Sequence, residues 1–145
     1  MKVLYIFVIC SILFTDKTRH IDYNGKKVKT TYNAPSEFYG IYKGKKEGYL
    51  KLNEDGSGEY KYDVFGFAPA SCKPSAIAIE WGFLVDEKDS LVSFTREYGL
   101  SYPILMKCTG DIRFQGCRKE VMLDFIMKYN KGGLGVSSSD DWIKN

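Results

Sequence analysis

A chain of 145 residues with 21 Lys and Arg, 18 Asp and Glu and a formal net charge of +3 is long enough for one domain with one core. This near balance excludes binding of nucleic acid or of an acidic membrane surface through bulk charge. Neither a phosphate-binding loop nor a dinucleotide fingerprint occurs in the sequence. With His20 as the single histidine, both a Ser-His-Asp or Cys-His catalytic device and a Cys/His zinc site are disfavoured. We therefore expect a protein that is not an enzyme, with no cofactor and no metal.

The chain begins with an apolar run from Val3 to Phe14, which follows Lys2 and ends at the charged stretch DKTRH. The run is too short to cross a bilayer as a helix, which needs about 20 apolar residues, and it is typical of a secretory signal peptide. We expect residues 1–15 to be a signal peptide and the protein to be exported to the periplasm, cell envelope or extracellular space. Cys10 leaves one alternative open, because a lipid on this cysteine would anchor the protein to a membrane.

Residues 16–36 are expected to form a basic leader or an edge hairpin. Asn24 and Gly25 are the favoured pair for a two-residue type I′ turn, which joins tightly paired antiparallel strands. A hairpin with this turn places Ile21 opposite Val28. We interpret its basic residues as a solvated surface rather than as a polyanion site.

Residues 37–129 are expected to form the barrel domain. Apolar residues recur there mostly with period two, and no window shows the stripe of an amphipathic helix. Short strands are expected in EFYGIYKG and in ILMKC, and a longer one in KEVMLDFIMKY, where apolar and polar positions alternate. The whole pattern is that of consecutive antiparallel strands.

A hairpin is expected in GYLKLNEDGSGEYKYD. Its loop is EDG, in which Gly56 supplies a positive φ. This register places Leu50 opposite Tyr60 on the inner face and Lys51 opposite Glu59 on the outer face.

The segment DVFGFAPASCKPSA, residues 63–76, is long for a link between two strands. It carries two prolines, together with Phe65 and Phe67 on either side of a glycine. Two interpretations stay open. The phenylalanines either fold over one end of the barrel and fill the core, or they contact a ligand or partner.

A further hairpin is expected between AIAIEWGFLV and SLVSFTREY, joined by DEKD. Its register places Trp81 opposite Phe94 and Ile77 opposite Tyr98. Arg96 then points to the same side as these aromatic side chains. It is expected either to cap the end of the barrel or to receive an anionic head group.

The stretch CTGDIRFQGC holds two cysteines, Cys108 and Cys117. If they face each other across a strand pair, Ile104 lies opposite Val121 and the apolar faces match. This predicts a disulfide that closes the loop, with Cys72 as a spare thiol in an exported protein. A link from Cys72 to either partner stays open, because connectivity cannot be read from spacing.

Residues 130–145, NKGGLGVSSSDDWIKN after Tyr129, are rich in glycine and serine and show no period. A flexible tail is expected, in which Trp142 either docks or does not.

The expected fold is all-β: a single small antiparallel barrel of six to eight strands in a meander. The reason is that short turns join the strands and no helix is long enough for a parallel crossover. A two-layer β-sandwich is the alternative.

The run FYGIYKGKKEGYLKLNEDGSGEYKYD, followed by IAIEWGFLV, resembles small secreted bacterial proteins described as lipocalin-like or calycin-like. In those a G-x-Y-x-G strand leads to an L-x-L-x-x-D-G-x-G-x-Y hairpin and later to a strand with a tryptophan. The resemblance covers roughly residues 38–98. It departs from the true lipocalin signature, because no G-x-W occurs on the first strand. It implies a hydrophobic ligand inside a barrel.

The function expected from these observations is the non-enzymatic binding of a small apolar or amphipathic molecule by an exported, monomeric barrel. The alternative is an envelope interaction or inhibitor protein with a solid core, which recognises a protein partner through its loops. The residues expected around the ligand are Trp81, Phe94, Arg96, Tyr98, Phe65 and Phe67.

Overall fold

The structure of the chain is a computed structural model that describes residues 16–44, 47–61, 76–97, 99–109, 120–127, 133–137 and 142–144. Its regular elements are strands, together with one short 3-10 helix in the described ranges. The strands are β1 (Thr18–Tyr23), β2 (Lys26–Thr31), β3 (Gly40–Lys43), β4 (Tyr49–Leu52), β5 (Ser57–Lys61), β6 (Ile77–Leu84), β7 (Phe94–Arg96), β8 (Gly99–Cys108), β9 (Glu120–Ile126), β10 (Gly135–Ser137) and β11 (Trp142–Lys144), and the helix is η1 (Ser36–Phe38).

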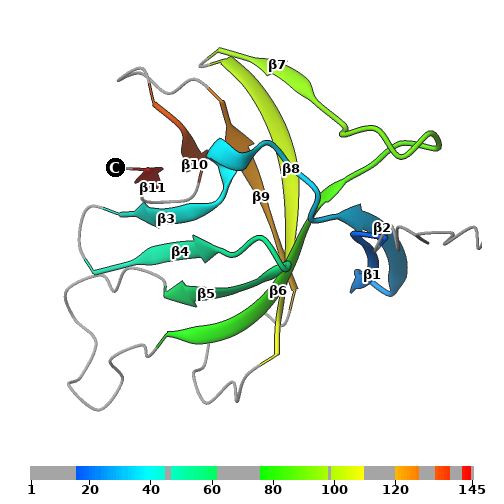
Figure 1. The fold of residues 1–145 in the computed structure, drawn as a ribbon, viewed down its shortest axis with the longest axis horizontal. Helices are drawn as coiled ribbons and strands as arrows, with labels where there is room; N and C mark the ends of the chain where they lie inside the picture. The colour runs from blue at the N-terminus through cyan, green and yellow to red at the C-terminus, as the bar shows by residue number, and fades with distance from the viewer. Residues whose placement is uncertain are drawn as a thin grey trace, which may run out of the picture.

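Eight of these strands close into one antiparallel barrel. The strands β3, β4, β5, β6, β8, β9, β10 and β11 pair in this order, and β11 returns to β3. Figure 1 shows the succession, with the colour running from cyan at β3 to red at β11. The prediction of an all-β barrel built as a meander is confirmed, and the sandwich alternative is not what the chain forms.

The hairpin of β4 and β5 forms in the predicted register. Leu50 pairs with Tyr60 and Lys51 with Glu59. Gly56 has a φ of 78°, a backbone conformation that glycine adopts without steric cost. On the outer face the Lys51 Nζ lies 4.0 Å from a Glu59 carboxylate oxygen, an exposed pair that contributes little to stability.

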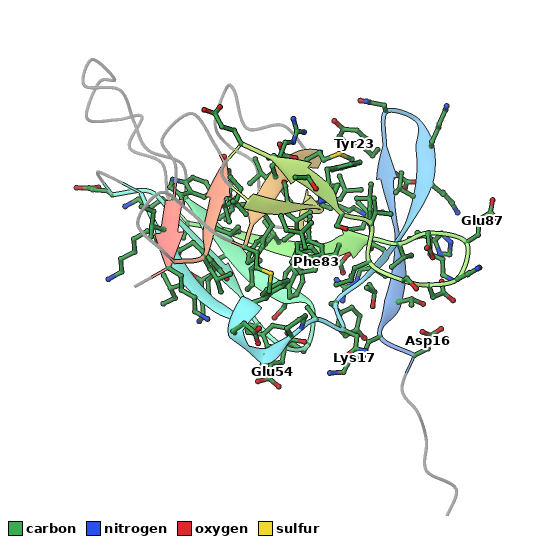
Figure 2. The ribbon with its side chains drawn as sticks, turned by 90° about the horizontal axis from the view of Figure 1, so that it is seen from above. Asp16, Lys17, Tyr23, Glu54, Phe83 and Glu87 are labelled. Atoms are coloured by element: carbon green, nitrogen blue, oxygen red, sulfur yellow. The ribbon has the colours of Figure 1, made fainter. Side chains whose placement is uncertain are left out.

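The hairpin of β1 and β2 also forms as predicted, but it lies outside the closed ring of strands (Figure 1). Ile21 pairs with Val28, and the turn residues Asn24 and Gly25 have φ values of 50° and 75°. Ile21 is fully buried, and β1 contacts β8 and β9. In Figure 2, Lys17 and Tyr23 mark the two ends of β1 beside the barrel. The N-terminal segment is therefore a docked hairpin.

A glycine allows this hairpin to approach the barrel wall. Thr30 and Thr31 of β2 pair with the end of β6. At Gly82 of β6, an added Cβ would stand 2.4 Å from the Thr30 Oγ1 and 2.6 Å from the Thr30 Cβ. The hairpin therefore docks where the wall carries no side chain.

Replacing Gly82 by alanine is expected to lower the free energy of unfolding by about 1–3 kcal/mol, the usual cost of overpacking a close contact. It should also speed amide exchange in β1 and β2 more than in the barrel strands. The matched control is Gly133→Ala, because a Cβ on Gly133 would meet nothing within 4 Å. Denaturant unfolding and residue-resolved hydrogen exchange measure both effects. Equal stabilities for the two variants would contradict this account of the docking.

Arg19 fastens the hairpin to the β4–β5 turn. Its Nη1 donates a hydrogen bond to the Gly56 carbonyl at 3.0 Å, and its Nη2 donates to the Asp55 carbonyl at 3.3 Å. The guanidinium also lies over the Tyr32 ring, 4.6 Å from its centroid. The Arg19 guanidinium therefore forms its contacts within the protein, where it links the hairpin to the barrel.

The predicted hairpin that places Trp81 opposite Phe94 is wrong. β6 pairs with β8 instead, so Trp81 lies opposite Met106. Phe94 belongs to β7, which pairs with the first residues of β8, and Phe94 lies opposite Ser101. The physical reason is that β8 offers ten residues, most of them buried, whereas the three residues of β7 are exposed.

The predicted register between the strands of Ile104 and Val121 is wrong by two residues. Ile104 pairs with Leu123, and Met106 pairs with Val121. A shift of two residues keeps each side chain on the same face, which is why the apolar pattern could not exclude it. The predicted register that brings Cys108 opposite Cys117 is therefore wrong. Cys117 lies outside the described residues, so the disulfide itself stays a prediction.

The expectation that residues 130–145 form a flexible tail is wrong for the parts that the structure describes. Residues 135–137 form β10, and residues 142–144 form β11 between β10 and β3. Trp142 is buried in the core with only 1% of its surface exposed. The barrel domain therefore extends beyond residue 129, and these two strands complete it.

Candidate functional site

One end of the barrel interior is filled by aromatic side chains around Phe38. The ring of Phe38 lies 5.6 Å from Phe83, 5.6 Å from Tyr102 and 4.7 Å from Phe125, measured between centroids. The Trp81 ring lies 5.6 Å from Phe83 in an edge-on contact. Figure 2 shows Phe83 among the side chains that fill the barrel. We call this part of the interior, Phe38 with Trp81, Phe83, Tyr102 and Phe125, the aromatic half.

The helix η1 brings Phe38 into this position. Pro35 is the N-cap residue of η1, and its φ of −51° is the value that the proline ring imposes. Phe38, the last residue of η1, is fully buried. The Tyr42 hydroxyl donates a hydrogen bond to the Phe38 carbonyl at 2.7 Å. From β11, the Lys144 ammonium donates to the carbonyls of Glu37 and, at 2.6 Å, Tyr39. These bonds hold the plug that closes this end of the barrel.

Burial raises the pKa of the Tyr42 hydroxyl well above its ordinary value, and the nearby Glu37 carboxylate adds to the rise. Because the folded-state pKa lies above the unfolded one, the unfolded chain loses this proton first as the pH rises. The stability that depends on the neutral hydroxyl is therefore present below about pH 10 and is lost above it.

Replacing Tyr42 by phenylalanine is expected to lower the free energy of unfolding at pH 7 by about 1–2 kcal/mol, because the buried Phe38 carbonyl loses its donor. Above pH 10 the free energy of unfolding of the variant should fall less steeply with pH than that of the parent. The two slopes should differ by up to about 1.4 kcal/mol per pH unit, the value for one proton. Urea unfolding from pH 7 to pH 11 measures both effects. Parallel pH profiles for the two proteins would rule out this role for the hydroxyl.

The other part of the interior has a different lining. Ile77 and Ile79 of β6 are buried there, and Ile79 pairs with the buried Cys108 of β8. The Trp142 ring lies 5.3 Å from the Tyr60 ring, between centroids. We call this group, Tyr60, Ile77, Ile79, Cys108 and Trp142, the far half. Two isoleucines, one cysteine and one tryptophan–tyrosine pair line it, in contrast to the tilted and edge-on rings around Phe38.

Two tryptophans in the core differ in their hydrogen bonding. The Trp81 indole N–H donates to the Ser57 carbonyl at 2.8 Å. The Trp142 Nε1 is buried and has no hydrogen-bond partner among the described residues. Such a group is costly, because a buried donor without an acceptor loses its bond to water.

Of the ligand residues predicted from the sequence, the three that the structure describes, Trp81, Phe94 and Arg96, do not come together. Trp81 faces the core as expected, but Phe94 is 45% exposed at the edge of the sheet. Arg96 is exposed as well, and its guanidinium lies 3.3 Å from the Asp124 carboxylate. The expectation that Phe94 and Arg96 lie beside Trp81 is therefore wrong, since β8 separates β7 from β6.

Several residues of the predicted site lie outside the described residues. They are Phe65 and Phe67 of the long loop, Tyr98, Cys72 and Cys117. Their ligand and disulfide roles stay predictions, as does the signal peptide over residues 1–15 with Cys10.

Sequence reasoning missed two residues that organise the interior. Phe38 was expected only as part of a strand, although its position after Pro35 and Ser36 is a signal for a turn before that strand. The sequence leaves open whether Trp142 docks, although an isolated tryptophan in a polar segment is a signal for docking. Together they define the plugged end and the far half.

No group of three or more His, Cys, Asp or Glu side chains suited to a metal ion occurs within the described ranges. No helix in that same part of the chain is long and apolar enough to span a membrane. Comparisons of the chain with protein-family models, with curated proteins and with solved structures gave no match.

Proposed function

We propose that this protein is an exported, non-enzymatic carrier that binds a small apolar or amphipathic molecule in the far half of its barrel. The observation that carries the proposal is the division of the interior. Phe38 and its neighbours fill one end with tilted and edge-on rings, whereas the far half is lined by Ile77, Ile79, Cys108 and the pair of Trp142 and Tyr60. Sites for small ligands are lined in this way, by apolar side chains and few polar groups.

The architecture supports the same proposal. An eight-stranded barrel has an interior just wide enough to be filled by side chains or to hold one small ligand. The resemblance of residues 38–98 to lipocalin-like proteins agrees with this use of the barrel. The apolar run at residues 3–14 supports export. The alternative of a solid-core protein that recognises a partner depends on a filled interior and on the loop of Phe65 and Phe67, which lies outside the described residues.

The proposal is tested with N-phenyl-1-naphthylamine, a dye whose fluorescence rises in apolar surroundings. We expect saturable binding of one dye molecule per chain. Ile79→Phe adds a ring to the far half and should weaken binding about tenfold, equivalent to about 1.4 kcal/mol. The matched control is Phe94→Ala at the exposed edge, which should bind as the parent does.

A second measurement covers the case in which Ile79→Phe does not fold. In the parent protein, the methyl signals of Ile77 and Ile79 should shift on dye binding, while the methyl signal of the exposed Ile41 should not. Dye binding that fails to saturate, or that moves none of the core methyl signals, would refute the proposal.

A further inference from the structure

Among the described residues, the polar side chains that face the barrel core include one buried donor without a partner. The Tyr42 hydroxyl and the Trp81 indole both donate to backbone carbonyls. Among the described residues, two buried side-chain atoms have no hydrogen-bond partner, the Trp142 Nε1 and the Ser101 Oγ. Ser101 is on the outer face of β8, because its neighbour Tyr102 packs against the core. The Trp142 N–H is therefore the unsatisfied donor of the interior.

The Trp142 indole is surrounded by the other residues of the far half. Trp142 pairs with Val136 of β10, which is fully buried, and its ring is tilted by 58° against the Tyr60 ring. With 1% of its surface exposed, the indole cannot exchange its missing bond for water. A buried donor in this state costs about 1–3 kcal/mol. An acceptor atom brought by a ligand would recover this free energy.

We propose that the Trp142 indole N–H donates a hydrogen bond to an uncharged acceptor oxygen on the ligand. This inference depends on the proposed function, because it names the chemistry of the molecule held in the far half. The ligand is then amphipathic, with an apolar body and a carbonyl, ester or hydroxyl oxygen directed at Trp142.

The absence of a buried cation among the described residues favours an uncharged oxygen. The buried polar side chains in that part of the chain are Thr30, Thr31 and Ser101. Lys144 of the same strand is directed to the carbonyls of Glu37 and Tyr39 at the plugged end. A carboxylate next to Trp142 would therefore lose its hydration without gaining a counter-ion, which is costly. A carbonyl or hydroxyl oxygen loses much less.

The inference is tested with three probes of equal chain length: octane, 2-octanone and octanoate. Because water solvates the ketone far better than octane, the two probes are compared in both the parent and Trp142→Phe. We expect the ratio of the octane to the 2-octanone dissociation constant to be about tenfold higher in the parent, since one recovered hydrogen bond of about 1.4 kcal/mol corresponds to that factor. Trp142→Phe keeps a ring but lacks the N–H, so 2-octanone should lose more affinity in this variant than octane does. The ratio of the two dissociation constants is the readout, because a change in cavity size affects both probes alike.

The indole signals give a direct second measurement. The chain has two tryptophans, so its 15N-edited spectrum contains two indole N–H signals, assigned by Trp142→Phe and Trp81→Phe. Addition of 2-octanone should move the Trp142 signal downfield and leave that of Trp81, which already donates to Ser57, almost unchanged.

The outcomes separate the two proposals. The same ratio of the two dissociation constants in the parent and in Trp142→Phe, with an unmoved Trp142 signal, overturns the inference and leaves the carrier function standing. Octanoate bound as tightly as 2-octanone overturns the choice of an uncharged oxygen. If none of the three probes binds, the carrier function fails and the inference fails with it.

Discussion

Deletion of residues 133–145 is expected to abolish cooperative folding. The deletion removes β10 and β11, so the ring of strands opens between β9 and β3. Each of these strands then loses its neighbour on one side, and the core loses Val136 and Trp142, both buried. Loss of a buried tryptophan side chain alone costs about 3–5 kcal/mol, out of a total stability that is typically about 5–15 kcal/mol.

Guanidinium unfolding followed by circular dichroism measures this effect. The matched control is a chain without Asn145 alone, which should unfold at the same denaturant concentration as the parent. A truncated chain that still gives a sigmoidal transition with an unchanged slope would show that β10 and β11 are dispensable.

Replacing Phe38 by alanine is expected to be the most damaging single substitution in the plug. The ring is fully buried and touches Phe83, Tyr102 and Phe125. Truncation of such a side chain costs about 3–5 kcal/mol, the transfer free energy of the ring plus the cavity that it leaves. The edge-on and tilted ring contacts add to the loss.

The matched control is Phe94→Ala, because Phe94 is the same residue type but 45% exposed. It should change the free energy of unfolding by less than about 0.5 kcal/mol. Both variants are compared by urea unfolding monitored through tryptophan fluorescence. Similar losses in the two variants would contradict the assignment of Phe38 as the plug and of Phe94 as an edge residue.

Hairpins whose two strands follow each other directly in the sequence could be predicted from the sequence. In the hairpins of β1–β2 and β4–β5, the turn residues Gly25 and Gly56 determine both the loop and the register. The alternation in β6 also predicted its inner face correctly. In these hairpins the turn residues and the two-residue period of apolar side chains are sufficient to determine the strand pairing.

Pairings between more distant segments could not be predicted in the same way. The stretch SLVSFTREY alternates well enough to act as a partner for β6, but the longer apolar β8 takes that place. The observed register of β8 and β9 differs from the predicted one by two residues. The alternation of apolar and polar residues cannot detect such a shift, because each side chain stays on the same face. β10 and β11 are three residues long and lie in a segment rich in glycine and serine, so they show no period at all.

The candidate site was predicted only in part for the same reason. Trp81 could be placed in the interior from its own strand. Placing Trp142 requires knowledge that β11 closes the ring against β3, and its unpaired N–H becomes visible only when every neighbour is in position. A helix as short as η1 likewise gives no period that would identify Phe38 as the plug.

Native mass spectrometry of the protein purified from its own exported fraction tests the central claim most directly. We expect a chain that lacks about the first 15 residues, in line with a cleaved signal peptide, and that carries one small uncharged molecule released on collisional activation. A chain that still begins at Met1 and carries no small molecule, with or without reductant, would contradict it.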